Sequence, residues 1–333
     1  MLYATTRDSQ NAYTAHRAML ENIAPDGGAF VPFRTPIFSM DEIAAFASGS
    51  MNQTISGVLN RLLSVKLNPW DVDFAVGRNI ARLIPLERKI IISELWHNPD
   101  GQYNHICTSL FRRLFGICDD SPSEWFCIAV SVAVYFGIYC ELCKQQTISA
   151  GDTMDVSVLA EDSINAIAIV YARKMGLPVG TIIFSGENIS ALWDLIHLGE
   201  ISTSVELAKK SFTERLLHAI LERQDYDNFR NQCDIGKVFR MDPESLEVFN
   251  HGLYCAVSGS DRKYSNVNSI YRSNHYITDP AVALCVGGLQ DFRAKSGQSK
   301  LTLVLSCTSP LNCLKQISES TGISEEKLIA IIE

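Results

Sequence analysis

Apolar residues follow several different spacings along this chain of 333 residues. The three- and four-residue spacing of a helix with one apolar face recurs at Ile55, Val58, Leu59, Leu62 and Leu63. From Lys89 the pattern changes to a short run, K-I-I-I-S-E-L, which is typical of a buried strand. We therefore expect an amphipathic helix in the first stretch and a strand leading into a polar loop in the second.

A sequence of strand, helix and strand is predicted between residues 155 and 184. Val156–Leu159 and Thr181–Phe184 are typical of strands. Ser163–Lys174 has helical spacing, and Gly176 and Pro178 after it are typical of the end of a helix. This order predicts a βαβ crossover, in which the two strands are parallel neighbours in one sheet.

Three further stretches complete the predicted elements. We expect a helix that ends at Gly199 and a last strand at Leu301–Leu305, before a C-terminal helical section. Between them, Asp225–Asn274 is expected to be a polar, mobile region.

The longest uncharged stretch is Trp125–Cys140, W-F-C-I-A-V-S-V-A-V-Y-F-G-I-Y-C. It is shorter than the roughly 20 apolar residues that a membrane-spanning helix needs, and its flanks carry no bias of Lys or Arg. We expect a buried core helix, with a membrane span as the alternative. Cys140 and Cys143 form a C-x-x-C at its end, which we interpret as packing cysteines because no second pair at zinc-finger spacing follows.

Charge and cysteine content argue against a nucleic-acid-binding protein and against a secreted disulfide protein. The formal net charge is -8, and Lys and Arg are scattered, so we expect no nucleic-acid partner. The chain has 10 cysteines at irregular spacings, and residues 1–20 contain no charged and apolar leader. These features predict reduced thiols in a cytoplasmic protein rather than a secreted disulfide framework.

Candidate chemistry concentrates in the loop Glu94–His105, which is E-L-W-H-N-P-D-G-Q-Y-N-H. His97 and His105 flank its turn, but no cluster of Asp, Glu or Cys completes a metal shell, so we interpret them as structural histidines and expect no metal. Ser306–Pro310, S-C-T-S-P, follows the last predicted strand. It could present hydroxyl groups to a ligand, or it could be a turn that starts a helix.

Several motifs resemble, in order along the chain, those of the threonine synthases, which are pyridoxal phosphate (PLP) lyases of fold type II. The motifs are Y-A-T-T-R at Tyr3–Arg7, I-A-P-D-G-G-A-F-V-P at Ile23–Pro32, Y-A-R-K-M-G-L-P at Tyr171–Pro178, S-F-T-E-R-L-L at Ser211–Leu217 and D-P-A-V-A at Asp279–Ala283. The resemblance implies an α/β fold with an open, twisted parallel sheet flanked by helices and a small N-terminal domain. It divides the chain into residues 1–88 and an α/β core domain of residues 89–333.

The resemblance also places the loop Glu94–His105 opposite the family's Glu-Leu-Phe-His-Gly-Pro-Thr-x-Ala-Phe-Lys-Asp, whose lysine forms the Schiff base with PLP. Asn104 stands at the lysine position and His105 at the following aspartate. A carboxamide nitrogen has no usable lone pair for attack on an aldehyde, whereas a lysine amine does. Imidazole forms no stable internal aldimine either, so this loop predicts no covalent cofactor.

Two further departures concern the cofactor phosphate and the small lobe. Where the family has a glycine-rich phosphate loop, this chain has L-A-E-D-S-I-N at Leu159–Asn165, and one unit-charge repulsion by Glu161 or Asp162 is worth about 4 kcal/mol. The same two acids are good helix caps. Only Ile106–Glu124 separate the loop from the apolar helix, too few for a βαβ unit of about 30 residues, so the family's small lobe is expected to be absent. S-A-G-D-T at Ser149–Thr153 is interpreted as a coincidental turn.

The leading interpretation is a shortened, threonine synthase-like pseudoenzyme that acts as a binding or regulatory protein. No catalytic residue and no cofactor are expected. Candidate cleft residues are His97, Asn98, Asn104, His105, Glu161, Asp162, Ser306 and Thr308. One alternative is a working PLP enzyme that converts O-phosphohomoserine to threonine, as the resemblance alone implies. Another is a non-catalytic subunit that pairs with a catalytic homologue, and the expected partners are a small molecule, a second copy or that homologue, without a membrane.

Overall fold

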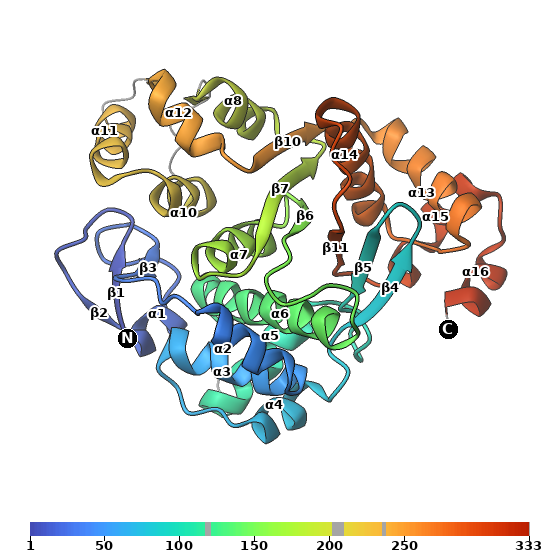
Figure 1. The fold of residues 1–333 in the computed structure, drawn as a ribbon, viewed down its shortest axis with the longest axis horizontal. Coiled ribbons are helices and arrows are strands. Elements are labelled where there is room, and N and C mark those ends of the chain that lie inside the picture. Colours follow the sequence, from blue (N-terminus) through green and yellow to red (C-terminus); the bar gives the residue numbers. More distant parts are fainter. Residues whose placement is uncertain (117–120, 202–209, 235–237, 333) are drawn as a thin grey trace.

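A six-stranded sheet forms the centre of the molecule (Figure 1). The computed structural model describes residues 1–116, 121–201, 210–234 and 238–332. The strand order is β10-β7-β6-β11-β5-β4, in which every neighbouring pair is parallel except β4 with β5. These strands are β4 (Arg82–Leu86), β5 (Ile90–Glu94), β6 (Met154–Leu159), β7 (Val179–Gly186), β10 (Leu253–Val257) and β11 (Thr302–Ser306).

Two small sheets accompany the large one among the described residues. The first is antiparallel, with the order β2-β1-β3, and the second pairs β8 with β9. Their strands are β1 (Leu2–Thr5), β2 (Tyr13–Thr14), β3 (Phe30–Pro32), β8 (Glu200–Ile201) and β9 (Phe239–Arg240).

The predicted crossover is confirmed. The first strand is β6, the helix is α7 (Ser163–Lys174) and the second strand is β7, which pairs with β6 in parallel, with Val156 opposite Ile182. The expected fold class is therefore correct: a mainly parallel sheet with helices on both faces, plus an antiparallel edge strand that the apolar pattern did not predict.

Ser149–Thr153 forms the predicted turn, in which the amide of Asp152 donates to the Ser149 carbonyl oxygen at 3.0 Å.

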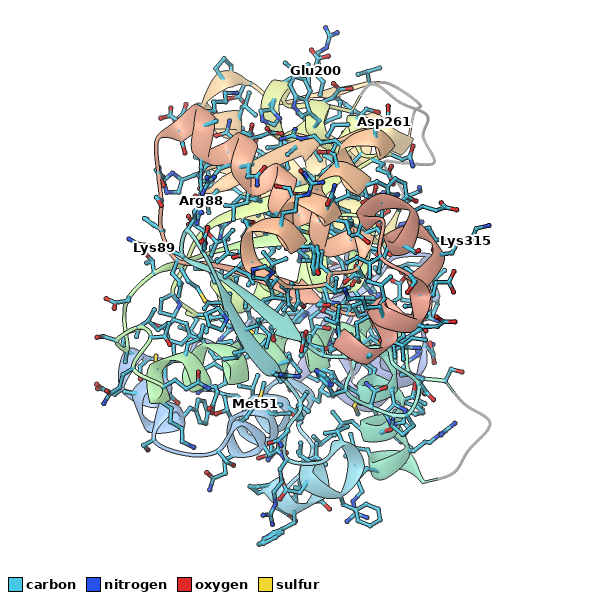
Figure 2. All side chains as sticks on the ribbon, turned by 90° about the vertical axis from the view of Figure 1, so that its right-hand side faces the viewer. Met51, Arg88, Lys89, Glu200, Asp261 and Lys315 are labelled. Atoms are coloured by element: carbon cyan, nitrogen blue, oxygen red, sulfur yellow. The ribbon has the colours of Figure 1, made fainter. Side chains whose placement is uncertain are left out.

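The antiparallel edge strand arises from a tight hairpin (Figure 2). Its turn is the three residues Glu87, Arg88 and Lys89, and the last two have φ of 59° and 57°, in the left-handed region that such turns use. Pro85 lies in β4, where its missing N–H costs nothing on an outer strand. The hairpin therefore places β5 inside the sheet, next to β11.

The uncharged stretch forms α6 (Glu124–Lys144), which lies between the N-terminal helices and the sheet (Figure 1). It is long and apolar enough to cross a membrane, but 89% of its most apolar 18-residue window is buried inside the protein. Its hydrophobic side chains contact neighbours on all sides, as expected of a core helix rather than an amphipathic one. Cys140 and Cys143 are free thiols, as predicted.

The remaining helices cover the sheet and the N-terminal strands. Helix α3 is the predicted amphipathic helix and packs along α6. These helices are α1 (Ala15–Leu20), α2 (Met40–Ala47), α3 (Met51–Leu63), α4 (Pro69–Val76), α5 (Asn104–Phe115), α8 (Ser190–Leu198), α10 (Ser211–Ile220), α11 (Arg223–Asp234), α12 (Pro243–Asn250), α13 (Ser260–Asn274), α14 (Pro280–Ser296), the 3-10 helix η1 (Pro310–Cys313), α15 (Leu314–Thr321) and α16 (Glu325–Ile332).

The prediction of a polar, mobile region over Asp225–Asn274 was wrong. Outside residues 235–237, which the structure does not describe, this stretch forms helices α11, α12 and α13 and strands β9 and β10. Strand β10 is even an outer strand of the main sheet. The polar composition of this stretch led to the wrong prediction because its helices cover only part of the sheet and expose their remaining surface to water.

Candidate ligand site at the carboxyl edge of the sheet

The parallel strands end together at one edge of the sheet. Ser306 of β11 lies opposite Glu94 of β5, and Leu159 of β6 lies opposite Ser185 of β7. The eight candidate residues lie at the end of β11, in the loops after these strands and at the start of α5. Such an edge is where open α/β sheets bind ligands.

Ser306 is buried and already engaged. Its hydroxyl donates to Asp279 Oδ2 at 3.0 Å and accepts from Trp96 Nε1 at 3.1 Å. Burial raises the pKa of Asp279, and the amides of the first turn of α14 partly offset this effect. The Ser306 hydroxyl therefore does not face a ligand. Ser309 caps the 3-10 helix, so Ser306–Pro310 is a turn that starts a helix.

The two histidines of the loop lie apart and have different partners. His97 Nε2 lies 2.8 Å from Glu94 Oε2, and the ring stacks on Trp96. His105 Nδ1 lies 2.8 Å from Asp100 Oδ2. Within the described part of the chain, no group of three or more His, Cys, Asp or Glu residues could hold a metal.

Asn98 and Thr308 shape the loop. The Asn98 amide donates to the Gln102 carbonyl oxygen at 3.0 Å, and its Oδ1 accepts from the Gln102 amide at 3.3 Å. Gln102 forms a β-bridge with Thr308, which ties this loop to the end of β11. The Asn98 side chain and the Thr308 backbone therefore hold the loop in place.

Asn104 is the first residue of α5 and is exposed. Together with His105 and Arg112 it borders a hollow of about 240 Å³ along the outer face of that helix. No side chain caps this helix at its N-terminus. The position offers a carboxamide where an amine would be needed for imine chemistry.

Asp162 caps α7, as predicted, whereas Glu161 does not. Asp162 Oδ1 accepts from the Asn165 amide at 3.2 Å. Glu161 instead reaches to the loop after β7, where its Oε1 accepts from the amides of Glu187 at 2.7 Å and Asn188 at 3.1 Å. The expectation that both acids cap the helix was therefore half wrong, since the side chain of Glu161 finds backbone donors in a loop that is distant in sequence.

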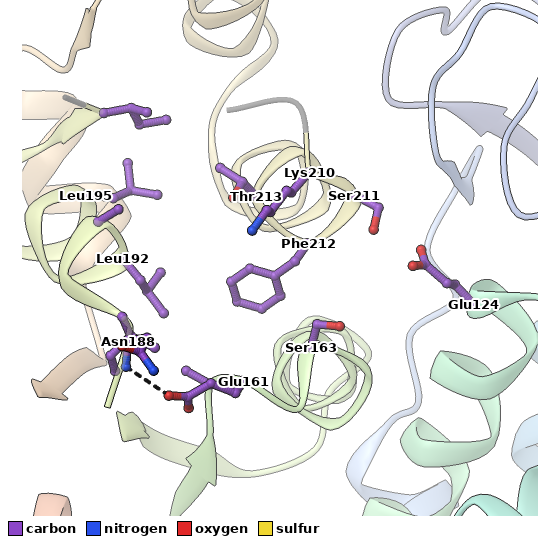
Figure 3. Close-up of a pocket in the computed structure, with 14 residues that line it drawn as sticks. Glu124, Glu161, Ser163, Asn188, Leu192, Leu195, Lys210, Ser211, Phe212 and Thr213 are labelled. Atoms are coloured by element: carbon purple, nitrogen blue, oxygen red, sulfur yellow. Dashed lines mark hydrogen bonds between the residues drawn. The ribbon is translucent and has the colours of Figure 1, made fainter. Parts of the chain in front are cut away.

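A larger hollow beside this edge was not predicted from the sequence (Figure 3). It has a volume of about 490 Å³ and lies between the loop after β6, the start of α8 and the first turn of α10. Leu192, Leu195 and Phe212 supply apolar walls, and Glu161 and Lys210 supply charges. The sequence signal was weak, because these residues come from segments that only the fold brings together.

The comparisons with known proteins agree on one family. Residues 2–73 match the family described as threonine synthase N terminus. Over 174 residues the chain is 25% identical to the human protein threonine synthase-like 1 and to its Macaca fascicularis counterpart, a stretch that covers 48% of this chain but only 23% of each relative. These matches support a member of the threonine synthase family.

Solved structures agree on the fold. Threonine synthase from yeast superposes with a TM-score of 0.79 at 14% identity, covering 98% of this chain and 91% of that one. PLP-bound threonine synthase from Brucella melitensis gives 0.79 at 15% identity, covering 97% of this chain and 92% of that one. At these identities the match concerns the fold alone.

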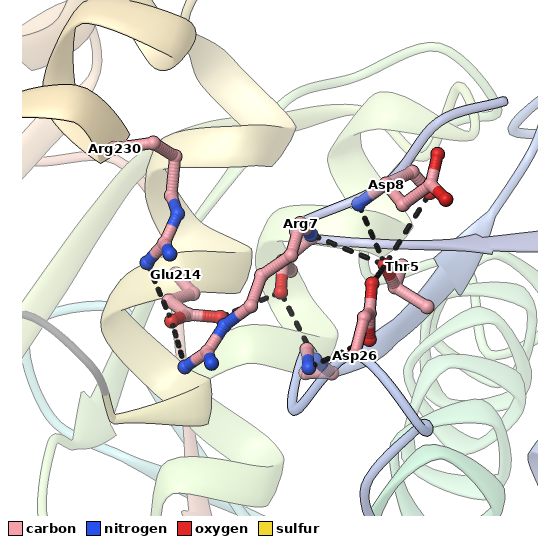
Figure 4. Close-up of polar contacts among 9 residues, drawn as sticks. Thr5, Arg7, Asp8, Asp26, Glu214 and Arg230 are labelled. Atoms are coloured by element: carbon pink, nitrogen blue, oxygen red, sulfur yellow. Dashed lines mark hydrogen bonds and ion pairs between the residues drawn. The ribbon is translucent and has the colours of Figure 1, made fainter. Parts of the chain in front are cut away.

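Three of the motifs that resemble the threonine synthase family, at Tyr3–Arg7, Ile23–Pro32 and Ser211–Leu217, meet at a polar cluster away from the sheet edge (Figure 4). Buried Glu214 accepts from Arg7 and Arg230, each at 3.0 Å, and from the Thr6 hydroxyl at 2.6 Å. Gly27, with φ of +75°, passes so close to Arg7 that a Cβ there would lie 2.7 Å from its Nη1. These contacts join the N-terminal segment to α10 and α11.

Proposed function

We propose that this chain is a non-catalytic member of the threonine synthase family that works as a binding or regulatory protein and does not hold PLP. The observation that carries the proposal is Asn104, which stands at the start of α5 where the family resemblance expects the Schiff-base lysine. Its carboxamide cannot condense with an aldehyde. His105, the neighbour, is held by Asp100.

The donors available for a phosphate support the same proposal. At the edge of β6 and β7, the amide at the start of α7 serves Asp162, and the amides after β7 serve Glu161. An incoming phosphate dianion would have to displace a carboxylate or lie beside it. Either arrangement opposes the charge complementarity on which phosphate loops depend.

The connection between α5 and α6 adds a third argument. Helix α5 ends at Phe115 and α6 begins at Glu124, which leaves no room for an inserted βαβ lobe. Without such a lobe, water would reach any imine formed at this edge. A shortened binding protein is therefore better supported than a working lyase.

The test is a spectral titration of the wild-type protein and of Asn104→Lys with PLP, followed by borohydride reduction and peptide mapping. We expect no saturable binding by the wild type. Asn104→Lys should also fail, because the substitution leaves Glu161 and Asp162 in place. Saturable micromolar binding by the wild type, or a reduced adduct at one lysine, would overturn the proposal.

Peptide mapping would identify an adduct on either of two lysines near this edge. Lys263 lies near the same edge but forms an ion pair with Glu187 at 2.7 Å, and Lys210 borders the larger hollow. A wild-type adduct on either one would reveal a rebuilt cofactor site. Asn104→Gln, which changes size without adding an amine, is the matched control for the lysine variant.

A further inference from the structure

We propose that the hollow of about 490 Å³ beside the sheet edge binds a free amino acid with an apolar side chain. The inference rests on the proposed function, because it takes this face to be free of PLP. It names the ligand class that the binding protein would recognise. The volume lies within the range of about 300 to 1,000 Å³ that small-molecule sites occupy.

Two opposite charges face the hollow from different elements. Lys210 stands at the start of α10 and Glu161 in the loop after β6, and Figure 3 shows them on opposite sides with Phe212 between them. Among the described residues neither one forms an ion pair with the other or with a third side chain. A ligand between them would have to offer a negative group to Lys210 and a positive group to Glu161.

The other acid of the hollow is already neutralised. Glu124 Oε2 lies 2.7 Å from Nη1 of Arg215, a buried side chain. Glu161 is therefore the acid whose charge is left for a ligand, although its Oε1 also accepts from two backbone amides. A simple anion would be repelled by Glu161 and a simple cation by Lys210, which leaves a zwitterion as the complementary class.

The apolar walls of the hollow favour a zwitterion with an apolar side chain. Leu192 and Leu195 of α8 face Phe212 of α10 across the hollow, which Ile189 also lines. Filling this space with aliphatic or aromatic carbon removes apolar surface from water on both partners. A polar side chain placed against these apolar walls would lose its hydration.

Helix α10 favours the same orientation of the ligand. Its first turn, Ser211–Thr213, lines the hollow, and no side chain caps its N-terminus. The partial positive charge of that end adds to the charge of Lys210. The ligand carboxylate therefore belongs next to α10 and its ammonium group next to Glu161.

The experiment is isothermal titration of the full chain with L-leucine and L-phenylalanine, and with two analogues of leucine that each lack one charge. These analogues are 4-methylpentanoic acid, without the ammonium group, and 3-methylbutylamine, without the carboxylate. We expect one of the amino acids to saturate below about 1 mM and both analogues to bind at least tenfold more weakly. L-Glutamate, with a polar side chain, should also bind at least tenfold more weakly.

Two variants assign the charges. Lys210→Met keeps the length of the side chain and removes the amine, so amino-acid binding should fall at least tenfold. Glu161→Gln keeps an oxygen for the amides of Glu187 and Asn188 and removes the charge, so binding should fall by a similar factor. Lys144→Met, at the far end of α6 and outside the hollow, is the control and should bind as the wild type does.

Three outcomes of these titrations would contradict the proposed amino-acid site. Binding of 4-methylpentanoic acid as tight as that of leucine, or equal binding by wild type, Lys210→Met and Glu161→Gln, would overturn the inference. So would the absence of binding by every amino acid up to 10 mM, a ceiling of roughly tenfold over the expected constant. None of these results bears on PLP, whereas a PLP adduct would overturn the proposed function by itself.

Discussion

Single residues at the sheet edge determine which chemistry is open to this protein. Asn104 offers a carboxamide, and one oxygen each of Glu161 and Asp162 accepts from backbone amides. The buried groups Trp96, Ser306 and Asp279 form a hydrogen-bonded chain that leads away from solvent. The polar side chains at this edge therefore mostly satisfy one another.

A pH-dependent stability follows from Asp279. Burial raises its pKa in the folded protein, so between about pH 4, its value in the unfolded chain, and the raised value the folded state binds more protons. Stability should therefore fall as the pH rises through this window. Asp279→Asn keeps the helix cap and an acceptor for Ser306 but does not titrate.

Urea titrations measure the free energy of unfolding of both proteins. As the pH rises from 4, we expect the wild type to lose stability relative to Asp279→Asn. Asp8→Asn is a control at an exposed carboxyl, whose pKa is lowered by the amide of Gln10; its effect on stability changes only below about pH 4, so its difference from wild type should stay nearly constant from pH 4 to 8. A constant difference between wild type and Asp279→Asn from pH 4 to 8 would contradict the argument.

At the scale of elements, helix α6 organises the fold by packing against α3 on one side and α7 on the other. The approach of α6 to α3 is close at Gly137, where a Cβ would lie 2.9 Å from Met51 Cγ and 3.5 Å from Ile55 Cγ1. A glycine there therefore serves packing rather than backbone conformation. Its lack of a side chain lets the two helices share one apolar seam.

Gly137→Leu should lower the free energy of unfolding by about 1 to 3 kcal/mol, because the added side chain overpacks the seam. Met51→Ala should also destabilise, by removing buried carbon. The double variant should be less destabilised than the sum of the two by at least about 1 kcal/mol, since the new side chain enters the space that Met51 leaves. Chemical denaturation of the four proteins measures this coupling, and strict additivity would show that the two side chains do not meet.

On the scale of the whole molecule, the N-terminal segment and the core share one interior. Trp125 of α6 contacts Tyr3 of β1 with ring centroids 5.6 Å apart and Tyr171 of α7 at 5.2 Å. One connected cluster of buried apolar residues runs from the N-terminal strands through α6 to β6, β7 and β11. Residues 1–88 and residues 89–333 therefore share buried apolar contacts.

We expect the chain to unfold in urea in a single transition, with coincident curves from tryptophan fluorescence and far-ultraviolet circular dichroism. Residues 1–88 expressed alone should give no cooperative transition, because α3 would then lack α6. Two separated transitions in the full chain would show that the segments fold independently. Phe74→Ala, on an exposed side chain of α4, is the control and should leave the midpoint nearly unchanged.

Local patterns alone were enough to predict the crossover, the core helix and the buried strand before the loop. The periods of 2 and 3.6 residues, and the Gly and Pro after Lys174, act over a few residues and need no partner. The sequence also showed Asn104 in place of a lysine and two acids in place of glycines. These are statements about which atoms are present, and folding cannot change them.

Tertiary structure alone decided where those atoms point. Asp162 capped its helix, which is a local event, whereas Glu161 bonded to amides 26 and 27 residues away in the loop after β7. Strand β10 and the hollow between α8 and α10 have the same origin, since each depends on segments far apart in the chain. Their residues carry no shared period, and only the packing of the sheet and its helices brings Lys210 and Glu161 to opposite sides of one cavity.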